Sequence, residues 1–389
     1  MAIPQRDEEI EAAEEEAAVG IAGLSDEDAA QIYAASQWRL MWWKFRKHRL
    51  AMGAGLVILA LYVVAIFCEF LAPYSLNYRQ VRYAFAPPQR LRVVSDDGIH
   101  LWPFVYGLKG VRHPETLRKF YLEDRTRRYP IRLFVRGEAY RFWGLFETDW
   151  HLFGVDAEGS LYLLGTDHLG RDLLSRIIYG SRISLTIGLV GVGMSFVFGL
   201  VIGGFSGYYG GWIDNLIQRG IEILRSFPSI PLWMALAAAL PSSWSPLQVY
   251  MGITVVLSFI GWTGLARQVR GKILSLREED FATAALLAGA SRWRILSRHL
   301  LPSFMSHIIV SLTLAVPGMI LGETSLSFLG LGLRPPVTSW GVLLKEAQNV
   351  QAVAFQPWLL TPVLFVIITV LAFNFVGDGL RDAADPYAR

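Results

Sequence analysis

The stretch SFPSIPLWMALAAALPSSWSPLQVYMGITVVLSFIGWTGLA, residues 226–266, contains no Asp, Glu, Lys or Arg in 41 consecutive residues. A helix needs about 20 apolar residues to cross the hydrocarbon core of a bilayer, so this run is long enough for two crossings. The segment PSSWSP at 241–246 has the Pro and Ser content of a turn and would separate the two helices. The run therefore predicts a pair of membrane-spanning helices.

Four further charge-poor runs have the length of a membrane-spanning helix: residues 50–72, 183–206, 303–322 and 357–377. With the two helices of the 226–266 run, they predict an all-α polytopic membrane protein with six transmembrane helices. The composition agrees, because 53% of the 389 residues are hydrophobic and only 18% are charged. The net charge of +3 is too small to indicate a nucleic-acid partner.

Basic residues predict the orientation of these helices. The segments 38–49, 207–225, 267–302 and the C-terminal tail together hold 16 Lys and Arg residues, whereas the short loops 241–246 and 323–356 hold two. Because Lys and Arg concentrate in cytoplasmic loops, this asymmetry predicts a multi-pass protein with both termini in the cytoplasm.

The remaining segments differ in composition. Residues 1–37 carry ten acidic residues and one basic residue, which predicts a mobile soluble tail. Basic residues alternate with Trp in 38–49, a juxtamembrane pattern that suits lipid headgroups. Gly-containing turns separate β-prone runs in 73–165, which predicts a β-rich extracytoplasmic insert between helices 1 and 2. That insert could be a cap packed on the membrane part or a docking surface for an outer partner.

A transporter needs an energy source, and the sequence offers none. Lys272 follows Gly271, but the spacing from Gly264 and the Ile at 273 do not fit a phosphate-binding loop. Ion-coupled carriers place ionisable groups within their spans, whereas Glu69 and Glu323 lie near predicted span ends, where we expect them to face solvent. The TDH at 166–168 is interpreted as a turn rather than a metal site. The energy should therefore come from another subunit.

The segment DFATAALLAGASRWRILSRHLLP, residues 280–302, is too charged to cross the bilayer and too apolar for a solvated loop. Its first half is helix-prone and, by helical spacing, places Ala282, Ala285 and Gly289 on one face. This ridge of small residues would let another surface approach closely. Gly289 can end the helix.

The second half of the segment is amphipathic by the same spacing. Trp293, Leu296 and Leu300 should share one side, with Arg294 and Arg298 on another. The predicted structure is helix, glycine turn, helix, lying at the inner membrane face.

The part TAALLAGASRWRILSRHLLP resembles the cytoplasmic coupling motif of ABC importer permeases, in which Glu-Ala-Ala is followed after three residues by Gly and, near the span, by Leu-Pro. Ala284, Ala285, Gly289, Leu301 and Pro302 keep that pattern. Thr283 stands in place of the motif's Glu, and His299 stands where an aliphatic residue is common. The resemblance implies that residues of this loop couple the chain to an ATPase: Glu278, Glu279, Thr283, Ala284, Ala285, Gly289, Arg294, Arg298 and Pro302.

Three further stretches resemble the oligopeptide, dipeptide and nickel branch of that family. They are LGTDHLGRDLLSRIIYGSRISL at 164–185, GETSLSFLGLGLRPPVTSWGVLL at 322–344 and GDGLRDAADP at 377–386. The resemblance implies a type I ABC importer permease fold, with an interfacial amphipathic segment at 166–182, a permease core at 183–379 and a cytoplasmic tail at 380–389.

The same resemblance implies the protein's setting: the plasma (inner) membrane of a prokaryote. Its partners would be a second permease subunit, two ATPase subunits and an extracytoplasmic solute-binding protein. ATP and Mg would be bound by the ATPases, so this chain would hold no cofactor or metal and would not itself be an enzyme. The solute stays open among peptides, oligosaccharides and metal chelates.

Two other functions remain compatible with the composition. An ion-gradient-driven secondary carrier would need no ATPase, although the charge-poor spans argue against it. A membrane scaffold or sensor could use the outer insert to bind a partner, but this would leave the coupling-like loop without a role.

Overall fold

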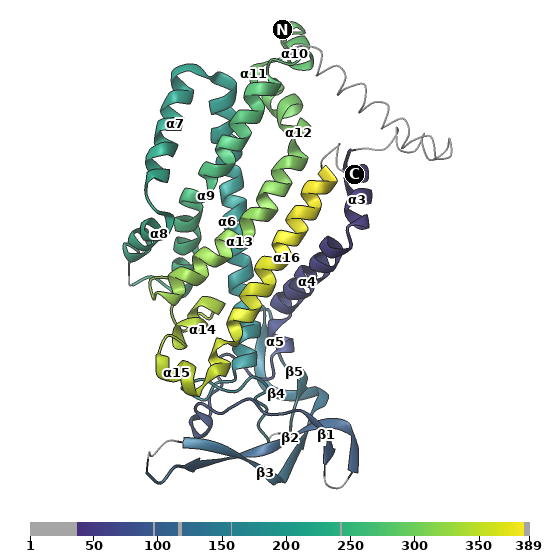
Figure 1. The fold of residues 1–389 in the computed structure, drawn as a ribbon, viewed down its shortest axis with the longest axis vertical. Helices are drawn as coiled ribbons and strands as arrows, with labels where there is room; N and C mark the ends of the chain where they lie inside the picture. The colour runs from purple at the N-terminus through teal and green to yellow at the C-terminus, as the bar shows by residue number, and fades with distance from the viewer. Residues whose placement is uncertain (1–36, 96–97, 116–118, 157, 242, 385–389) are drawn as a thin grey trace, which may run out of the picture.

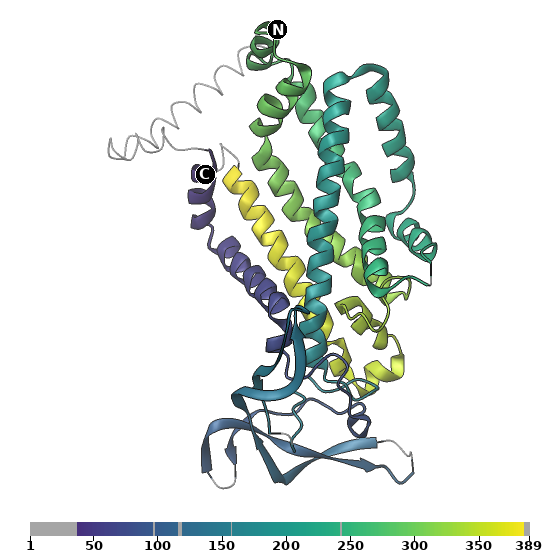
Figure 2. The same cartoon turned by 180° about the vertical axis from the view of Figure 1, so that it is seen from behind.

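The protein, here a computed structural model, is a bundle of long helices with antiparallel strands gathered at one end (Figure 1, Figure 2). The structure describes residues 37–95, 98–115, 119–156, 158–241 and 243–384. The predicted acidic tail lies outside these residues except for Gln37, and so does the end of the predicted C-terminal tail.

Five of the described helices are long and apolar enough to cross a membrane. They are α4 (Arg49–Ile66), α6 (Leu173–Tyr209), α9 (Pro246–Leu276), α13 (Met305–Phe328), and α16 (Thr361–Ala384) with the preceding η3 (Pro357–Leu360). The described part of the chain is therefore mostly helical and multi-spanning, but six spans are not confirmed.

The predicted span without a matching long helix in the structure is the first half of the 226–266 run. Helix α7 (Gly211–Ser226) ends where this run begins, and the run itself forms only the short α8 (Ser229–Ala238), whose ten residues extend about 15 Å. Pro228 lies at the N-cap of α8 and Pro241 follows its end. Proline lacks the N–H that continues a helix, so the apolar run is divided where composition alone predicted one span.

The remaining short helical segments lie before or between these spans. They are α3 (Gln37–Lys47), α5 (Cys68–Leu71), η1 (Val81–Tyr83), α10 (Asp280–Leu287), α11 (Arg292–Arg294), the π-helix η2 (Ile295–Leu300), α12 (Leu301–Ser303), α14 (Trp340–Glu346) and α15 (Val350–Phe355). Figure 1 shows α3, α10 and the C-terminal end of α16 at the same end of the bundle.

Five strands lie between α5 and α6, at the opposite end of the bundle (Figure 1). They are β1 (Arg92–Ser95), β2 (Gly98–Arg112), β3 (Lys119–Pro130), β4 (Arg132–Phe142) and β5 (Phe146–Gly154). The first three form one antiparallel sheet in the order β1-β2-β3, and β4 and β5 form a separate hairpin.

Arg182 of α6 holds the strands to the helices. Its guanidinium makes two 2.5 Å bonds to the carboxylate of Glu69 and donates to the carbonyl oxygens of Ala65 and Ile66, both at 2.9 Å. These carbonyls at the end of α4 have no partner within the helix. The same guanidinium lies 4.2 Å from the ring centroid of Trp143, in the β4–β5 turn. Glu69 is therefore buried in an ion pair rather than facing solvent, as its place near a span end had suggested.

Helices α6 and α9 approach closely because glycines recur every fourth residue on α6. A Cβ at Gly203 would lie 2.4 Å from the carbonyl oxygen of Ala266, and one at Gly207 would lie 2.8 Å from that of Arg270. Gly199 faces the side chain of Leu265 in the same way. Small residues at this spacing let membrane helices pack backbone to backbone.

Gly203→Ala should destabilise the protein, because the added methyl group overlaps the α9 backbone and overpacking costs about 1–3 kcal/mol. Gly193→Ala, on the same helix, is the control, because a Cβ there meets no atom within 4 Å. Alanine is the better helix former by about 1 kcal/mol, so Gly193→Ala should leave stability unchanged or raise it. Melting of the purified chain in detergent measures both; equal melting temperatures would contradict the close approach.

Candidate coupling site and transport path

The predicted coupling segment contains α10, and a glycine ends this helix. Gly289 has φ of 80°, and the N–H of Ala290 donates to the carbonyl oxygen of Ala285 at 3.0 Å. A left-handed residue with this bond pattern is the usual C-terminal stop of a helix, and glycine adopts it without a Cβ penalty. The helix and glycine turn expected from the sequence are both present.

The small residues of α10 were expected to face a partner, but they pack against the rest of this chain. Ala282 is 3% exposed and packs into an apolar cluster with residues of α9, η2 and α13, and Ala285 is half-buried against the same cluster. Phe281, Leu286 and Leu287 are exposed instead, Leu287 by 84%. The small residues therefore let α10 lie close to its own chain, and larger apolar residues form the exposed face.

The second half of the segment departs from α-helical spacing. Residues Ile295–Leu300 form a π-helix, in which each turn holds more residues because the bonds run from i to i+5. Ile295 and Leu300 consequently share the buried side with Leu296, whereas Trp293 is 62% exposed. The predicted apolar side is correct for Leu296 and Leu300 and wrong for Trp293.

Most of the predicted coupling residues lie on the surface of the described chain. Ala285 is half-buried, and the others are exposed: Glu278, Glu279, Thr283, Ala284, Gly289, Arg294, Arg298 and Pro302. They lie at the end of the bundle opposite the strands (Figure 1).

An ion pair braces the helices beside this segment. Arg270 of α9 makes two 2.5 Å bonds to the carboxylate of Asp214, in the first turn of α7. Ser206 of α6 also donates to Asp214, at 2.5 Å. The hydrogen bond and positive charge of Arg270 hold the pKa of Asp214 below its usual range, so the carboxylate stays charged at neutral pH. Three helices thus meet at one carboxylate.

At the other end of the spans, Glu323 of α13 is fully buried, which contradicts the expectation that it faces solvent. Ser339 and Ser327 donate to its Oε1 at 2.6 and 2.7 Å, and Ser184 donates to its Oε2 at 3.4 Å. An ion-coupled carrier would also bury a carboxylate, but here serine hydroxyls satisfy it.

Each of these serines also accepts a backbone N–H. Ser327 accepts from Leu333 at 3.0 Å, Ser184 from Trp340 at 3.1 Å, and Ser339 from Val342 at 3.2 Å. The carboxylate of Glu323 therefore orients three hydroxyls that fix the loop after α13, the start of α14 and α6. The 322–344 stretch forms one hydrogen-bonded unit.

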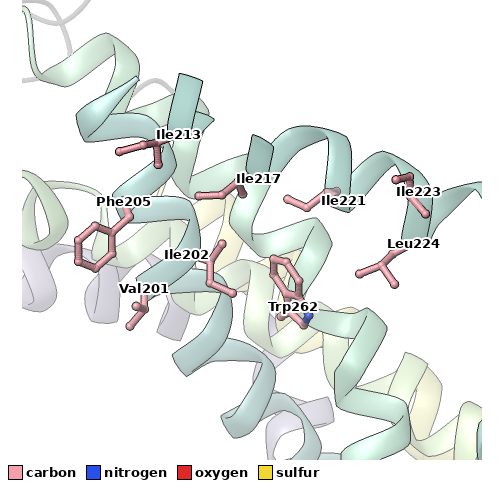
Figure 3. A pocket seen from close by; sticks show the side chains of 10 residues that line it. Val201, Ile202, Phe205, Ile213, Ile217, Ile221, Ile223, Leu224 and Trp262 are labelled. Atoms are coloured by element: carbon pink, nitrogen blue, oxygen red, sulfur yellow. The ribbon is translucent and has the colours of Figure 1, made fainter. Parts of the chain in front are cut away.

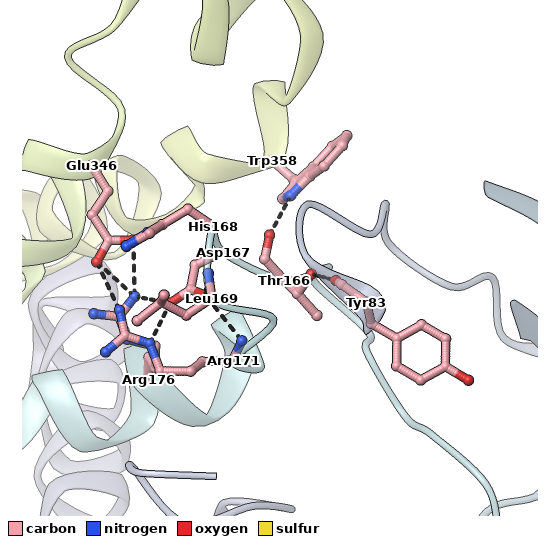
Figure 4. A network of polar contacts seen from close by, with 9 residues as sticks. All are labelled: Tyr83, Thr166, Asp167, His168, Leu169, Arg171, Arg176, Glu346 and Trp358. Atoms are coloured by element: carbon pink, nitrogen blue, oxygen red, sulfur yellow. Dashed lines mark hydrogen bonds and ion pairs between the residues drawn. The ribbon is translucent and has the colours of Figure 1, made fainter. Parts of the chain in front are cut away.

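A second polar cluster joins the start of α6 to the end of α14 (Figure 4). Arg171 Nε and Arg176 Nη1 each lie 2.6 Å from Oδ2 of Asp167, which is fully buried. Arg176 Nη1 is also 2.9 Å from Oε1 of Glu346, and Arg171 Nη2 is 3.2 Å from the same atom. Two guanidinium groups thus neutralise two carboxylates.

His168 lies at the edge of this cluster, with Nδ1 3.4 Å from Oε2 of Glu346. The bond to Glu346 raises the pKa of His168. Burial alone would raise the pKa of Glu346, but His168 and the two arginines outweigh it and lower that pKa. Asp167, His168 and Glu346 have the spacing of metal ligands, yet the guanidinium groups already bind both carboxylates, so the arrangement fits an ion-pair network better than a cation site.

Two hollows open between the spans. The larger, of about 720 Å³, lies between α6, α7 and α9, and Figure 3 shows apolar side chains such as Phe205, Ile217 and Trp262 around it. The smaller, of about 290 Å³, lies between α6, α8, α9 and α13. Its lining includes Ser195 and Trp233, whose Oγ and Nε1 are buried without a hydrogen-bond partner. Of these two hollows, only the smaller is lined by Ser and Gln side chains.

Glu323→Ala should lower the melting temperature of the chain, because its serine donors would lose their buried acceptor, at about 1–3 kcal/mol for each group left unsatisfied. Glu323→Gln keeps one carbonyl oxygen for Ser327 and Ser339 and should cost less. Melting in detergent compares the two variants. If Glu323→Gln were as damaging as Glu323→Ala, these hydrogen bonds would not be what Glu323 contributes.

Comparison with known proteins agrees with this architecture. Residues 199–389 match the sequence model of one protein family, the binding-protein-dependent transport system inner membrane component. Residues 36–88 match that of a second family, the N-terminal TM domain of oligopeptide transport permease C. The chain is 42% identical over 245 residues to the oligopeptide transport system permease protein OppC of Haemophilus influenzae, a match that covers 62% of this chain and 76% of that protein.

Two relatives match along most of the chain. The glutathione transport system permease protein GsiD of Pectobacterium atrosepticum is 32% identical, over 90% of this chain and 91% of that protein. The dipeptide transport system permease protein DppC of Lactococcus lactis is 32% identical, over 95% of this chain and 96% of that protein. The chain belongs to the binding-protein-dependent transport system inner membrane component family, as a multi-pass inner-membrane permease subunit of an ABC importer.

Proposed function

We propose that this permease forms half of a translocation path for peptides, paired with a second permease subunit. Two ATPases would bind ATP and Mg below it, and a solute-binding protein would deliver solute above it. The peptide assignment rests on the solutes named for the oligopeptide and dipeptide relatives. In this proposal the chain itself holds no cofactor or metal.

The proposed orientation places α3, α10 and the C-terminal end of α16 in the cytoplasm and the strands outside. The basic residues of α3 and of the 267–302 loop support this orientation, because α3, α10, α11 and α12 lie at the same end of the bundle (Figure 1). The insert at 92–154 would then lie on the side from which solute arrives, as a cap or a docking surface.

The packing of α10 carries the coupling proposal. One side of the helix is fixed to the spans, because Ala282 lies in a cluster with Ile273 of α9, Leu300 of η2 and Ile308 of α13. The other side exposes Phe281 and Leu287. An ATPase that binds the exposed side and moves would therefore shift α9 and α13 together, as in rigid-body rearrangements of packed helices.

The smaller hollow is the proposed path within this half. Gln268, which is exposed, and Ser311, which is half-buried, place polar side chains in the lining, and the unpartnered Ser195 Oγ and Trp233 Nε1 lie buried behind it. Such groups suit the amides of a peptide, whereas the apolar lining of the larger hollow suits lipid chains or another helix. A Cβ at Gly318 would meet no atom within 4 Å, so this part of the lining has space.

Leu287→Asp should reduce ATP-dependent peptide uptake about tenfold or more, because a charge would enter an apolar contact and each 1.4 kcal/mol lost is tenfold in binding. Ile99→Asp is the matched control, since Ile99 is 86% exposed at the opposite end of the molecule. Uptake into membrane vesicles and co-purification of the ATPases measure both variants. Unchanged uptake by Leu287→Asp would refute docking on α10.

Gly318→Leu should block uptake while the chain still assembles with its partners, because Gly318 lines the hollow and a Cβ there meets no atom of this chain within 4 Å. Gly193→Leu is the control: its Cβ also meets open space, and Gly193 lines neither hollow. Loss of the second permease on purification of Gly318→Leu would mean that the hollow is a subunit contact; normal uptake would mean that it is not on the path.

A further inference from the structure

The turn between β4 and β5 is apolar and exposed. Its sequence is FWGLF, residues 142–146, with Phe142 paired to Phe146 across the hairpin. Leu145 is 81% exposed, Phe146 57% and Trp143 50%. Hairpin turns in water are usually made of Gly, Asn, Asp, Ser or Pro, so this composition indicates that water does not cover the turn.

The apolar character ends abruptly at a charged pair. Arg141 and Glu147 face each other across the hairpin, one step behind the Phe142–Phe146 pair. The hairpin tip, defined here as residues 142–146, is therefore an apolar end on a strand pair whose next position is charged.

The hairpin tip is fixed at the end of the first span. Trp143 Nε1 donates to the carbonyl oxygen of Ile66 at 2.9 Å, and the rings of Phe142 and Phe67 are 6.0 Å apart between centroids. The guanidinium of Arg182 lies over the Trp143 ring. Figure 1 shows β4 and β5 next to α5, just beyond α4. These contacts settle where the hairpin tip lies relative to the membrane helices.

The hairpin tip continues the exposed apolar surface of α4. Only 17% of this span is buried in the described chain, and Leu56, Leu59, Val63 and Ile66 are exposed at helical spacing along it, followed by Phe67. The 18 residues of α4 extend about 27 Å, close to the roughly 30 Å of a hydrocarbon core. The end of α4, and the hairpin tip with it, should thus lie where hydrocarbon meets headgroups.

We propose that the hairpin tip inserts into the bilayer interface and anchors the strand insert to lipid. Trp143 and Arg182 lie at headgroup level, where amphipathic rings and cations are favoured. Leu145 and Phe146 contact the acyl chains, as apolar residues of interfacial segments do. With the orientation proposed above, this is the outer leaflet. The insert is then held against the membrane surface at a fixed height.

A spin label at the hairpin tip tests this directly. Leu145→Cys and Phe146→Cys are made in a Cys68→Ser background, because Cys68 is the only native cysteine. Ile99→Cys, 86% exposed on β2, is the control. The importer complex carrying each label is placed in phospholipid nanodiscs, and collision rates with oxygen and with water-soluble chromium oxalate are measured. Oxygen concentrates in hydrocarbon, whereas chromium oxalate stays in water.

Labels at 145 and 146 should collide more with oxygen and less with chromium oxalate than the label at 99. Chromium oxalate access equal to that of position 99 would overturn the proposal, because the hairpin tip would be in water. Protection from both reagents would overturn it as well, because another protein surface would then cover the tip. The readout is independent of solute uptake, so failure of the proposed transport role would leave it interpretable.

Discussion

A carboxylate inside a membrane helix bundle has to find its partners within the protein, because hydrocarbon offers no hydrogen bonds. Glu323 meets this requirement by accepting hydrogen bonds from three serine hydroxyls. Each hydroxyl in turn accepts a hydrogen bond from a backbone N–H. The loop after α13, the start of α14 and the adjoining part of α6 take their positions from this one group. A buried carboxylate in a span could indicate an ion-coupled carrier, but here Glu323 holds the surrounding segments in place through hydrogen bonds.

Hydrogen bonds to one buried carboxylate also hold the opposite end of the bundle. Asp214 gathers α6, α7 and α9 through Ser206 and Arg270, while the glycines of α6 let its backbone touch that of α9. With two helices in backbone contact and a third tied to them by an ion pair, a displacement at this end moves the group together. This rigidity is what the proposed push on α10 needs, since a flexible connection would absorb it.

The strand insert shows how an addition to a membrane core is positioned. Arg182 satisfies the carbonyl groups at the end of α4, neutralises Glu69 and lies over Trp143, so one side chain joins span and insert. Because these bonds are buried or half-buried, they fix the insert more firmly than contacts between exposed charges would. The helices and the strands are thereby held in one orientation.

Much of the architecture follows from the sequence alone. Charge-poor runs of about 20 residues predict spans because the bilayer sets their length, and they located α4, α6, α9, α13 and α16. The helix and glycine turn at 280–289 were equally predictable, because only local geometry is involved. The sixth predicted span is not confirmed, because the structure has only the ten-residue helix α8 between Pro228 and Pro241.

Tertiary structure decided what those segments contact. Helical spacing placed Ala282 and Ala285 on one face, but it did not show whether that face meets a partner or its own chain. The π-helix at Ile295–Leu300 also changed the spacing from that of an α-helix. Glu69 and Glu323 looked exposed because Arg182 and Ser184, which bond to them, lie 113 and 139 residues away in sequence. The sequence by itself located the five described helices that are long and apolar enough to cross a membrane, since that depends on the composition of each segment. Which side chains are buried was decided only by the fold, because burial depends on residues brought together from distant parts of the chain.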